Sequence, residues 1–149
     1  MSDTKTRDGL TIPDQLLSKM IARAREASEN AYCPYSGFPV GACVLAADGE
    51  LFSGCNVENA SYGLTICAER NAIFRAVTEG ARRIEGLVVY TPTDQPVAPC
   101  GACRQALYEF GSGAAVLCLC DTSERLSSSL AELLPKAFGP EQLQAPCDD

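Results

Sequence analysis

Two short segments of the sequence place thiols and a carboxylate where they could act together on a metal ion. Residues 64–71 read LTICAERN, with Cys67 two positions before Glu69. Residues 98–105 read APCGACRQ, with Cys100 and Cys103 three positions apart behind a proline. The chain contains no histidine, which excludes catalysis by a serine or cysteine paired with an imidazole. A metal site must therefore use thiolates and carboxylates, a donor set that favours zinc.

The three cysteines are predicted to lie at the starts of two helices. Cys100 and Cys103 are one turn apart and can face the same point, and Cys67 has the same setting on the other helix. The unpaired N–H groups and partial positive charge of a helix N-terminus favour thiolate over thiol. Three converging thiolates predict a tetrahedral zinc site with one corner open to water, which is the arrangement of a catalytic zinc.

Glu69 is well placed to move protons at such a site. Residues two apart on a regular helix point about 200° from one another, so Glu69 and Cys67 cannot ligate one ion from the side of the helix. In the first turn, however, Glu69 can lean over the helix end and reach a water on the metal. A proton shuttle belongs at that position.

Other interpretations of the cysteines are open at this point. A single C-x-x-C pair also occurs in structural zinc knuckles and redox pairs, and Cys118 or Cys120 could close a structural site with four protein ligands. The apolar run around these two residues favours buried core thiols instead. The same core interpretation applies to Cys33, Cys43 and Cys55, and Cys147 is expected to be exposed in the polar tail.

Composition and charge narrow the class of partner. The 149 residues carry 12 basic and 19 acidic side chains, a net charge of −7. Binding to RNA or DNA draws most of its affinity from Lys and Arg, so this balance argues against a nucleic-acid partner. No apolar run is long enough to span a bilayer, and the first residues lack the apolar stretch of a signal peptide. We therefore expect a cytoplasmic protein (a nuclear location is also allowed) that acts on a small molecule and not at a membrane.

Hydrophobic periodicity and turn signals predict an α/β fold. Helical spacing runs from about Pro13 to Ala31, followed by a β-hairpin that turns at Asp48–Gly49. Further helices are expected at 67–79, 100–110 and 127–135, with buried strands at 84–92 and 114–120. Apolar strands alternating with helices imply a sheet covered on both faces, so the fold class is a three-layer α/β/α sandwich with a mixed sheet. Residues 1–11 are expected to be a disordered leader, 12–140 a single domain and 141–149 a flexible tail.

Four motifs give the chain a family resemblance. The CAE and PCGAC segments resemble the zinc deaminase signature, Cys-x-Glu followed by Pro-Cys-x-x-Cys. GCNVENASYG at 54–63 and KAFG at 136–139 resemble the short, homotetrameric cytidine deaminases with a three-cysteine zinc site. The resemblance runs from about Leu16 to Phe138, and it implies the cytidine deaminase-like form of the α/β/α sandwich.

The resemblance implies an activity and a mechanism. The reaction would be the hydrolytic deamination of cytidine and deoxycytidine to uridine and deoxyuridine, in pyrimidine salvage. Cys67, Cys100 and Cys103 would hold one Zn²⁺ per subunit, and zinc-bound hydroxide would attack C4 of the base. Glu69 would pass protons from the water to the ring nitrogen and the leaving amine.

The resemblance also implies substrate contacts and a homotetramer with shared pockets. Asn56 and Glu58 would bind the ribose hydroxyls, Phe38 would pack on the pyrimidine, and the main chain at Ala68 would meet the carbonyl oxygen of the base. Without the resemblance, Asn-x-Glu at a strand end is often only turn chemistry. Positions 60, 62 and 138 would complete a neighbouring subunit's pocket. The predicted substrate-binding residues are Phe38, Asn56, Val57, Glu58, Asn59, Ala60, Ser61, Tyr62, Ala68 and Phe138.

Arg70 is predicted to balance the charge at the metal. Three thiolates on Zn²⁺ leave a net charge of −1, which makes the metal a weaker acid. Arg70 follows Glu69 and could donate to the sulfurs, withdrawing part of that charge. Arg104 is the other candidate for this role, and the alternative for Arg70 is a surface position on an exposed helix face.

Three other functions are alternatives to nucleoside deamination. A deaminase of the same fold acting on cytosine in RNA or DNA is disfavoured by the acidic charge balance. A deaminase of a cytosine-nucleoside antibiotic is a closer alternative, although the Asn-x-Glu contact with ribose favours ordinary nucleosides. A non-enzymatic zinc module needs a fourth protein ligand and leaves Glu69 without a role.

Overall fold

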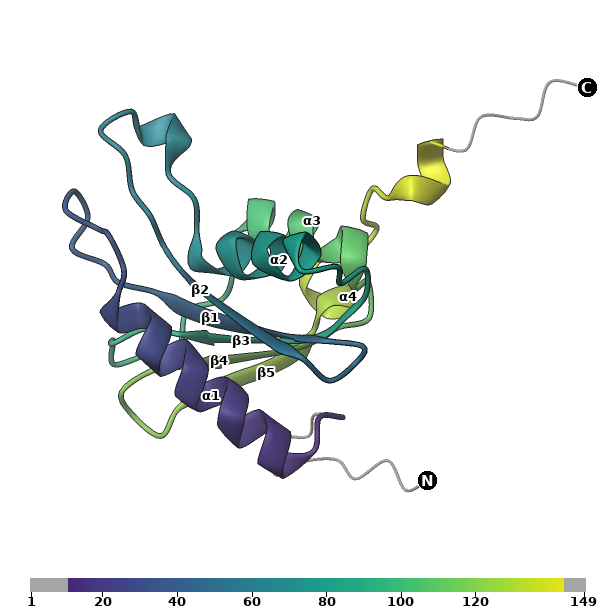
Figure 1. The fold of residues 1–149 in the computed structure, drawn as a ribbon, viewed down its shortest axis with the longest axis horizontal. Coiled ribbons are helices and arrows are strands. Elements are labelled where there is room, and N and C mark those ends of the chain that lie inside the picture. The colour runs from purple at the N-terminus through teal and green to yellow at the C-terminus, as the bar shows by residue number, and fades with distance from the viewer. Residues whose placement is uncertain (1–10, 144–149) are drawn as a thin grey trace, which may run out of the picture.

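The protein is a three-layer α/β/α sandwich, seen in a computed structural model that describes residues 11–143 (Figure 1). A five-stranded mixed sheet with the order β2-β1-β3-β4-β5 forms the middle layer. Helix α1 covers one face, and α2, α3 and α4 cover the other. The elements are α1 (Asp14–Glu29), β1 (Gly41–Ala46), β2 (Leu51–Cys55), α2 (Ala68–Thr78), β3 (Ile84–Tyr90), α3 (Gly101–Phe110), β4 (Ala115–Leu119), β5 (Arg125–Ser129) and α4 (Leu130–Leu133), with short 3₁₀ turns at Tyr62–Leu64 and Pro140–Leu143. The predicted fold class is confirmed.

The sheet follows the pattern of apolar residues along the strands. β1 and β2 form the predicted antiparallel hairpin, in which Gly49 takes a φ of 90° that an L side chain rarely adopts. β3 and β4 are parallel, and the crossover between them carries α3. Along β4, Val116 faces the core under α2 and α3, whereas Leu117 faces the core under α1. Burial on both faces explains why β4 is apolar at every position and why β3 carries a charged side chain only at the exposed Glu85.

One predicted element is wrong. The helix expected at 127–135 is replaced by strand β5, which pairs antiparallel with β4, and by the four-residue helix α4. The three consecutive serines are poor helix formers, and pairing them with β4 satisfies the backbone groups that β4 would otherwise expose at the sheet edge. Ser129 then caps α4 in a capping box with Glu132. The S-x-x-E spacing in the sequence marks this later helix start.

The cysteines outside the two helix starts divide into two groups. Cys43, Cys118 and Cys120 are buried, as predicted for core thiols, whereas Cys33 and Cys55 are only half-buried. Cys55 ends the edge strand β2, and Cys33 lies in the loop after α1, so the core interpretation was wrong for these two. Cys147, most of the predicted leader and most of the predicted tail lie outside the described residues.

Between residues 11 and 143, no helix combines the length and the apolar character needed to cross a membrane.

Candidate active site

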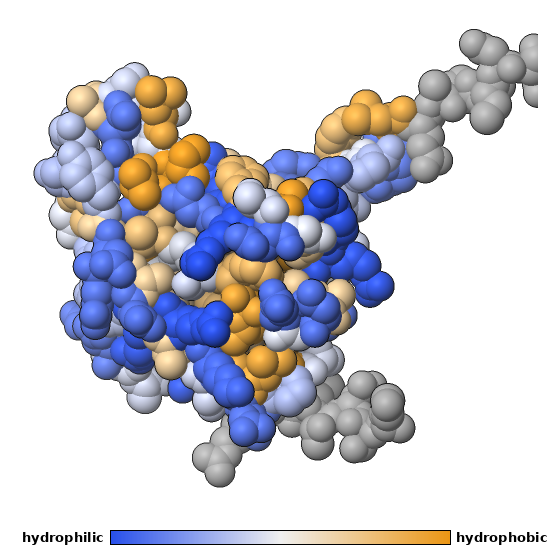
Figure 2. Space-filling model, in the orientation of Figure 1, coloured by the Kyte–Doolittle hydropathy of each residue, from blue (hydrophilic) through white to orange (hydrophobic). Residues whose placement is uncertain are grey.

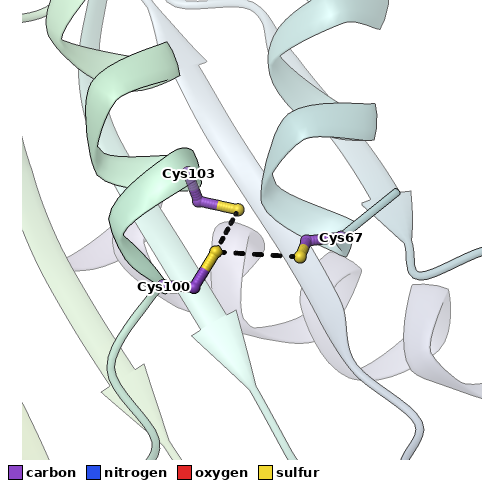
Figure 3. A group of neighbouring side chains, drawn as sticks. All are labelled: Cys67, Cys100 and Cys103. Atoms are coloured by element: carbon purple, nitrogen blue, oxygen red, sulfur yellow. Dashed lines mark hydrogen bonds between the residues drawn. The ribbon is translucent and has the colours of Figure 1, made fainter. Parts of the chain in front are cut away.

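Helices α2 and α3 begin beside one another and bring the three predicted thiols together (Figure 3). Cys67 is the N-cap residue of α2 and Cys100 is the N-cap residue of α3, both in extended backbone conformations. Neither side chain caps its own helix, so both thiols are left to point toward the space between the helix ends. Cys103 joins them from the first turn of α3.

The spacing of the sulfurs fits a tetrahedral zinc site. The Sγ atom of Cys100 lies 3.9 Å from that of Cys67 and 3.5 Å from that of Cys103, and all three lie within 4.8 Å of one another. Zn–S bonds of about 2.3 Å in tetrahedral geometry separate two sulfurs by about 3.8 Å. Within residues 11–143 the cluster includes neither Cys118 nor Cys120, which contradicts the alternative of a closed site completed by one of these thiols.

The protonation of the cluster also favours a cation. Hydrogen bonds from Cys103, Arg70 and Cys100 lower the pKa of Cys67 to about 5, even though burial opposes this. The pKa of Cys103 is raised, because its thiol interacts with Cys67, is buried and lies near the Glu69 carboxylate. One thiolate therefore forces its neighbour to keep a proton when no cation is bound. A divalent ion can replace such protons and draw all three sulfurs into the thiolate form.

Glu69 lies beside the sulfurs but outside their cluster, as the sequence predicted. The side chain is only 6% exposed, and Cys103 Sγ donates to its Oε2 over 3.6 Å. Burial, reinforced by the charge of Cys67, raises the pKa of this carboxyl. A carboxyl group that accepts a proton more readily than an exposed one is suited to general acid–base work near neutral pH.

The two arginines proposed for charge balance have different partners. Arg70 is half-buried, and its Nη2 donates to Cys67 Sγ over 3.5 Å. Arg104 instead donates from Nε to Pro99 O over 2.8 Å and from Nη1 to Leu133 O over 2.7 Å. Arg70 thus faces the sulfurs, whereas Arg104 ties the segment before Cys100 to α4.

A cleft of ≈ 380 Å³ opens next to the thiols. Three of the predicted substrate-binding residues line it, namely Phe38, Asn56 and Ala68, together with Cys67, Glu69 and Cys100. Its other lining residues are Ser36, Val40, Thr65, Val89, Thr91, Val97 and Ala98. Sequence reasoning missed this last set. The one available signal was that Val89 and Thr91 lie at the carboxyl end of a buried strand, where α/β folds place ligands.

The remaining predicted substrate-binding residues do not line the cleft of their own chain. Val57, Glu58, Asn59, Ala60, Ser61 and Tyr62 lie on the loop that projects beyond α2, and Phe138 lies on the C-terminal segment (Figure 1). Tyr62 is 74% exposed and Phe138 57%. Figure 2 shows apolar surface on both the projecting loop and the C-terminal segment, where Val57, Leu64 and Leu143 are also exposed.

Comparisons with known proteins agree with this geometry. A family model described as the cytidine and deoxycytidylate deaminase zinc-binding region matches residues 14–119. The chain is 47% identical over 128 residues to the cytidine deaminase of Sporosarcina psychrophila, covering 85% of this chain and 94% of the relative. It is 46% identical over 130 residues to the probable cytidine deaminase of Dictyostelium discoideum, covering 87% and 88% of the two chains.

Solved structures give the same result. The crystal structure of cytidine deaminase from Burkholderia pseudomallei superimposes with a TM-score of 0.78 at 45% identity, covering 81% of this chain and 98% of the other. The crystal structure of the Mycobacterium tuberculosis cytidine deaminase gives a TM-score of 0.73 at 40% identity, covering 86% and 99%. With the zinc-site thiols, the adjacent carboxylate, the sequence and the fold all in agreement, the chain belongs to the cytidine deaminase family.

Proposed function

We propose that this protein catalyses the hydrolysis of cytidine and deoxycytidine to uridine and deoxyuridine with release of ammonia. The observation that carries the proposal is the convergence of three helix-start thiols and a buried carboxylate at one cleft. The cytidine deaminase relatives, which match over most of their own length, support the same reaction.

The sulfurs of Cys67, Cys100 and Cys103 would hold the zinc ion. When bound, zinc supplies the Lewis acidity that makes water a nucleophile near neutral pH. The thiols contribute a site preformed by two rigid helix starts, and Arg70 contributes a positive charge against the sulfur of Cys67. This arginine offsets part of the negative charge that three thiolates bring to the site.

Glu69 would carry the protons. Its carboxylate would take one proton from the attacking water and deliver it to the ring nitrogen, then take the second proton from the same oxygen and deliver it to the departing amine. Because the group is buried next to the sulfurs, its carboxyl oxygens stay close to the reacting atoms and away from bulk water.

The cleft suits a neutral pyrimidine nucleoside. Among the residues that the structure describes, its lining includes apolar and small side chains but neither Lys nor Arg, so none of these side chains compensates the charge of a phosphate. This composition supports a free nucleoside over a nucleotide, RNA or DNA. Phe38 would pack on the base and Asn56 would bind a sugar hydroxyl from within the cleft. Glu58, which does not line the cleft, would meet the sugar from the adjoining loop.

We also propose that the active unit is a homotetramer in which each cleft is completed by neighbours. The exposed positions of Tyr62 and Phe138, outside the cleft of their own chain, support a role in a neighbouring subunit. Exposed apolar side chains next to them would be buried by the same association. The reducing cytoplasm is the proposed location, since it keeps the eight described free cysteines unoxidised.

The direct test is to incubate the purified zinc-loaded protein with cytidine and follow uridine and ammonia together. Stoichiometric appearance of both products is expected, with deoxycytidine also converted. Cytidine 5′-monophosphate and single-stranded DNA containing cytosine serve as comparison substrates. Turnover of either of these in preference to cytidine, or no turnover of cytidine at all, would contradict the proposal.

A further inference from the structure

Phe38 reaches the cleft from a loop with little packing of its own. Residues 34–38 are all exposed, and the Phe38 side chain is 39% exposed although it lines the cleft. Gly37, next to it, takes a φ of 63° in the left-handed region. A segment with few buried apolar contacts opens easily, so its conformation depends on hydrogen bonds to the rest of the fold and on the contact between the rings of Tyr35 and Tyr62.

Glu58 supplies two of these hydrogen bonds. Its Oε1 accepts from the backbone N–H of Tyr35 over 3.0 Å and from that of Ser36 over 3.1 Å. The pKa of Glu58 is lowered, because hydrogen bonds from Ser36 and Tyr35 outweigh the opposing effect of burial. The group is thus a carboxylate at neutral pH, and hydrogen bonds to a charged acceptor are stronger than those between neutral groups.

Asn56 holds the other side of the same loop. Its Nδ2 donates to Phe38 O over 2.8 Å, and its Oδ1 accepts from Val40 N over 2.8 Å. The N–H of Phe38 is in turn bonded to Ser36 Oγ over 3.0 Å. The backbone on both sides of Phe38 is therefore fixed by the two residues expected to bind the sugar.

We propose that Glu58 is a positioning residue for Phe38, which it holds at the cleft through its two hydrogen bonds to the loop at 33–38. The inference rests on the proposed function, in which Phe38 packs on the pyrimidine. Glu58 would then have two roles. It would bind the sugar directly, and it would affect the binding of the base by positioning Phe38. Both backbone bonds end on Oε1, and a carboxylate offers acceptor sites on two oxygens, so one side chain would serve both roles.

The first test needs no substrate. The chain contains no tryptophan, so Phe38→Trp creates a single fluorescent probe at the position in question. Adding Glu58→Ala is expected to increase quenching of this probe by acrylamide and to lower its fluorescence anisotropy. With Glu58→Gln instead, the acrylamide quenching and the anisotropy are expected to stay close to those of the Phe38→Trp protein. The amide oxygen still accepts from Tyr35 and Ser36. Glu26→Ala, on exposed α1 surface, removes the same charge and is expected to change neither signal.

The second test is a double-mutant cycle on the turnover of cytidine. If Glu58 acts partly through Phe38, the loss in kcat/KM caused by Glu58→Ala is smaller, by about tenfold, when Phe38 is already Ala. A role confined to the sugar predicts equal losses in both backgrounds and an unchanged tryptophan signal, and either result overturns the inference. Failure of the wild-type protein to deaminate cytidine would instead overturn the proposed function, while the fluorescence test would still decide the position of Phe38.

Discussion

The guanidinium of Arg70 lies against the thiol of Cys67, with Nη2 3.5 Å from Sγ. Its Nε is buried without a hydrogen-bond partner in the part of the chain that the structure describes. Leaving a donor unpaired in this way is unfavourable, so the position of Arg70 is set by the attraction between its charge and the sulfurs. The contact follows from the sequence, because residues 67 and 70 are one helical turn apart.

Replacement of Arg70 by Gln is expected to lower activity and zinc affinity by about 10- to 100-fold, the usual effect of removing a partner of a metal ligand. Replacing Cys67 by His in the same background removes one negative charge from the ligand set and should restore part of the loss. The measurements are kcat/KM with cytidine and zinc competition with a chelator. Arg75→Gln on exposed α2 surface is the matched control. If the double variant retains zinc but regains no activity, charge balance is not the role of Arg70.

Replacement of Glu69 by Gln should abolish most of the turnover while leaving zinc content and fold intact. Gln has nearly the same shape but cannot exchange protons, and general acid–base steps are worth roughly 10²- to 10⁴-fold. A residue that serves several transfers in one cycle should reach or exceed the upper end of that range. Single-turnover kinetics with cytidine, alongside metal analysis and circular dichroism, check the prediction. A variant that remains within tenfold of the wild-type rate would show that another group moves the protons.

Elemental analysis should find one zinc per chain. Cys100→Ala removes one of three ligands and is expected to release the metal and abolish activity, because two thiolates hold zinc far less tightly than three. Cys33→Ala, at a half-buried thiol outside the cluster, should keep full zinc occupancy. Chelation followed by addition of zinc should remove and then restore activity in the wild-type protein. Full zinc content in the Cys100→Ala protein would contradict the three-thiol site.

Two inactive variants should complement each other if clefts are shared between subunits. Glu69→Gln would inactivate its own cleft, whereas Phe138→Ala would, under the proposed sharing, impair the cleft of a neighbouring subunit. Unfolding and refolding the two chains together should give mixed tetramers in which some clefts have both residues intact. Their activity should therefore exceed the sum of the separate variants. An activity that only averages the two, with subunit exchange demonstrated by mass spectrometry, would assign Phe138 to its own chain.

A methyl group at Gly54 should destabilise the protein and impair the site together. A Cβ built at Gly54 would lie 2.5 Å from Ala72 N and 2.8 Å from Ala68 O on α2. Gly54→Ala must therefore push away the helix that carries Cys67 and Glu69, and overpacking of this kind costs about 1–3 kcal/mol. Thermal unfolding and kcat/KM measure the two effects. Gly113→Ala, where the added Cβ has no neighbour within 4 Å, should leave both nearly unchanged.

The residues of the metal site could be predicted from the sequence, because their arrangement depends on short spacings along the chain. Cys67, Glu69 and Arg70 fall within one helical turn, and so do Cys100 and Cys103. Helix geometry fixes how residues this close can face one another. Apolar periodicity and turn signals likewise predicted α1, α2, α3 and the four strands from β1 to β4, since each of these elements has a clear apolar pattern or a clear turn beside it.

Only the tertiary structure decided the lining of the cleft, the presence of strand β5 and the hydrogen-bond partners of Glu58 and Asn56. Each of these depends on residues far apart in the chain. The cleft brings together residues near 36–40, 65–69, 89–91 and 97–100, and Asn56. No local sequence pattern predicts which of these segments will lie side by side. The strand β5 has no apolar pattern of its own and exists because β4 offers it a partner. Glu58 and Asn56 were predicted as sugar ligands, with turn chemistry at a strand end as the alternative, and their side chains do bond to the loop of Phe38. The sequence determines which donors and acceptors a side chain has. The tertiary structure determines which groups lie within hydrogen-bonding distance of them.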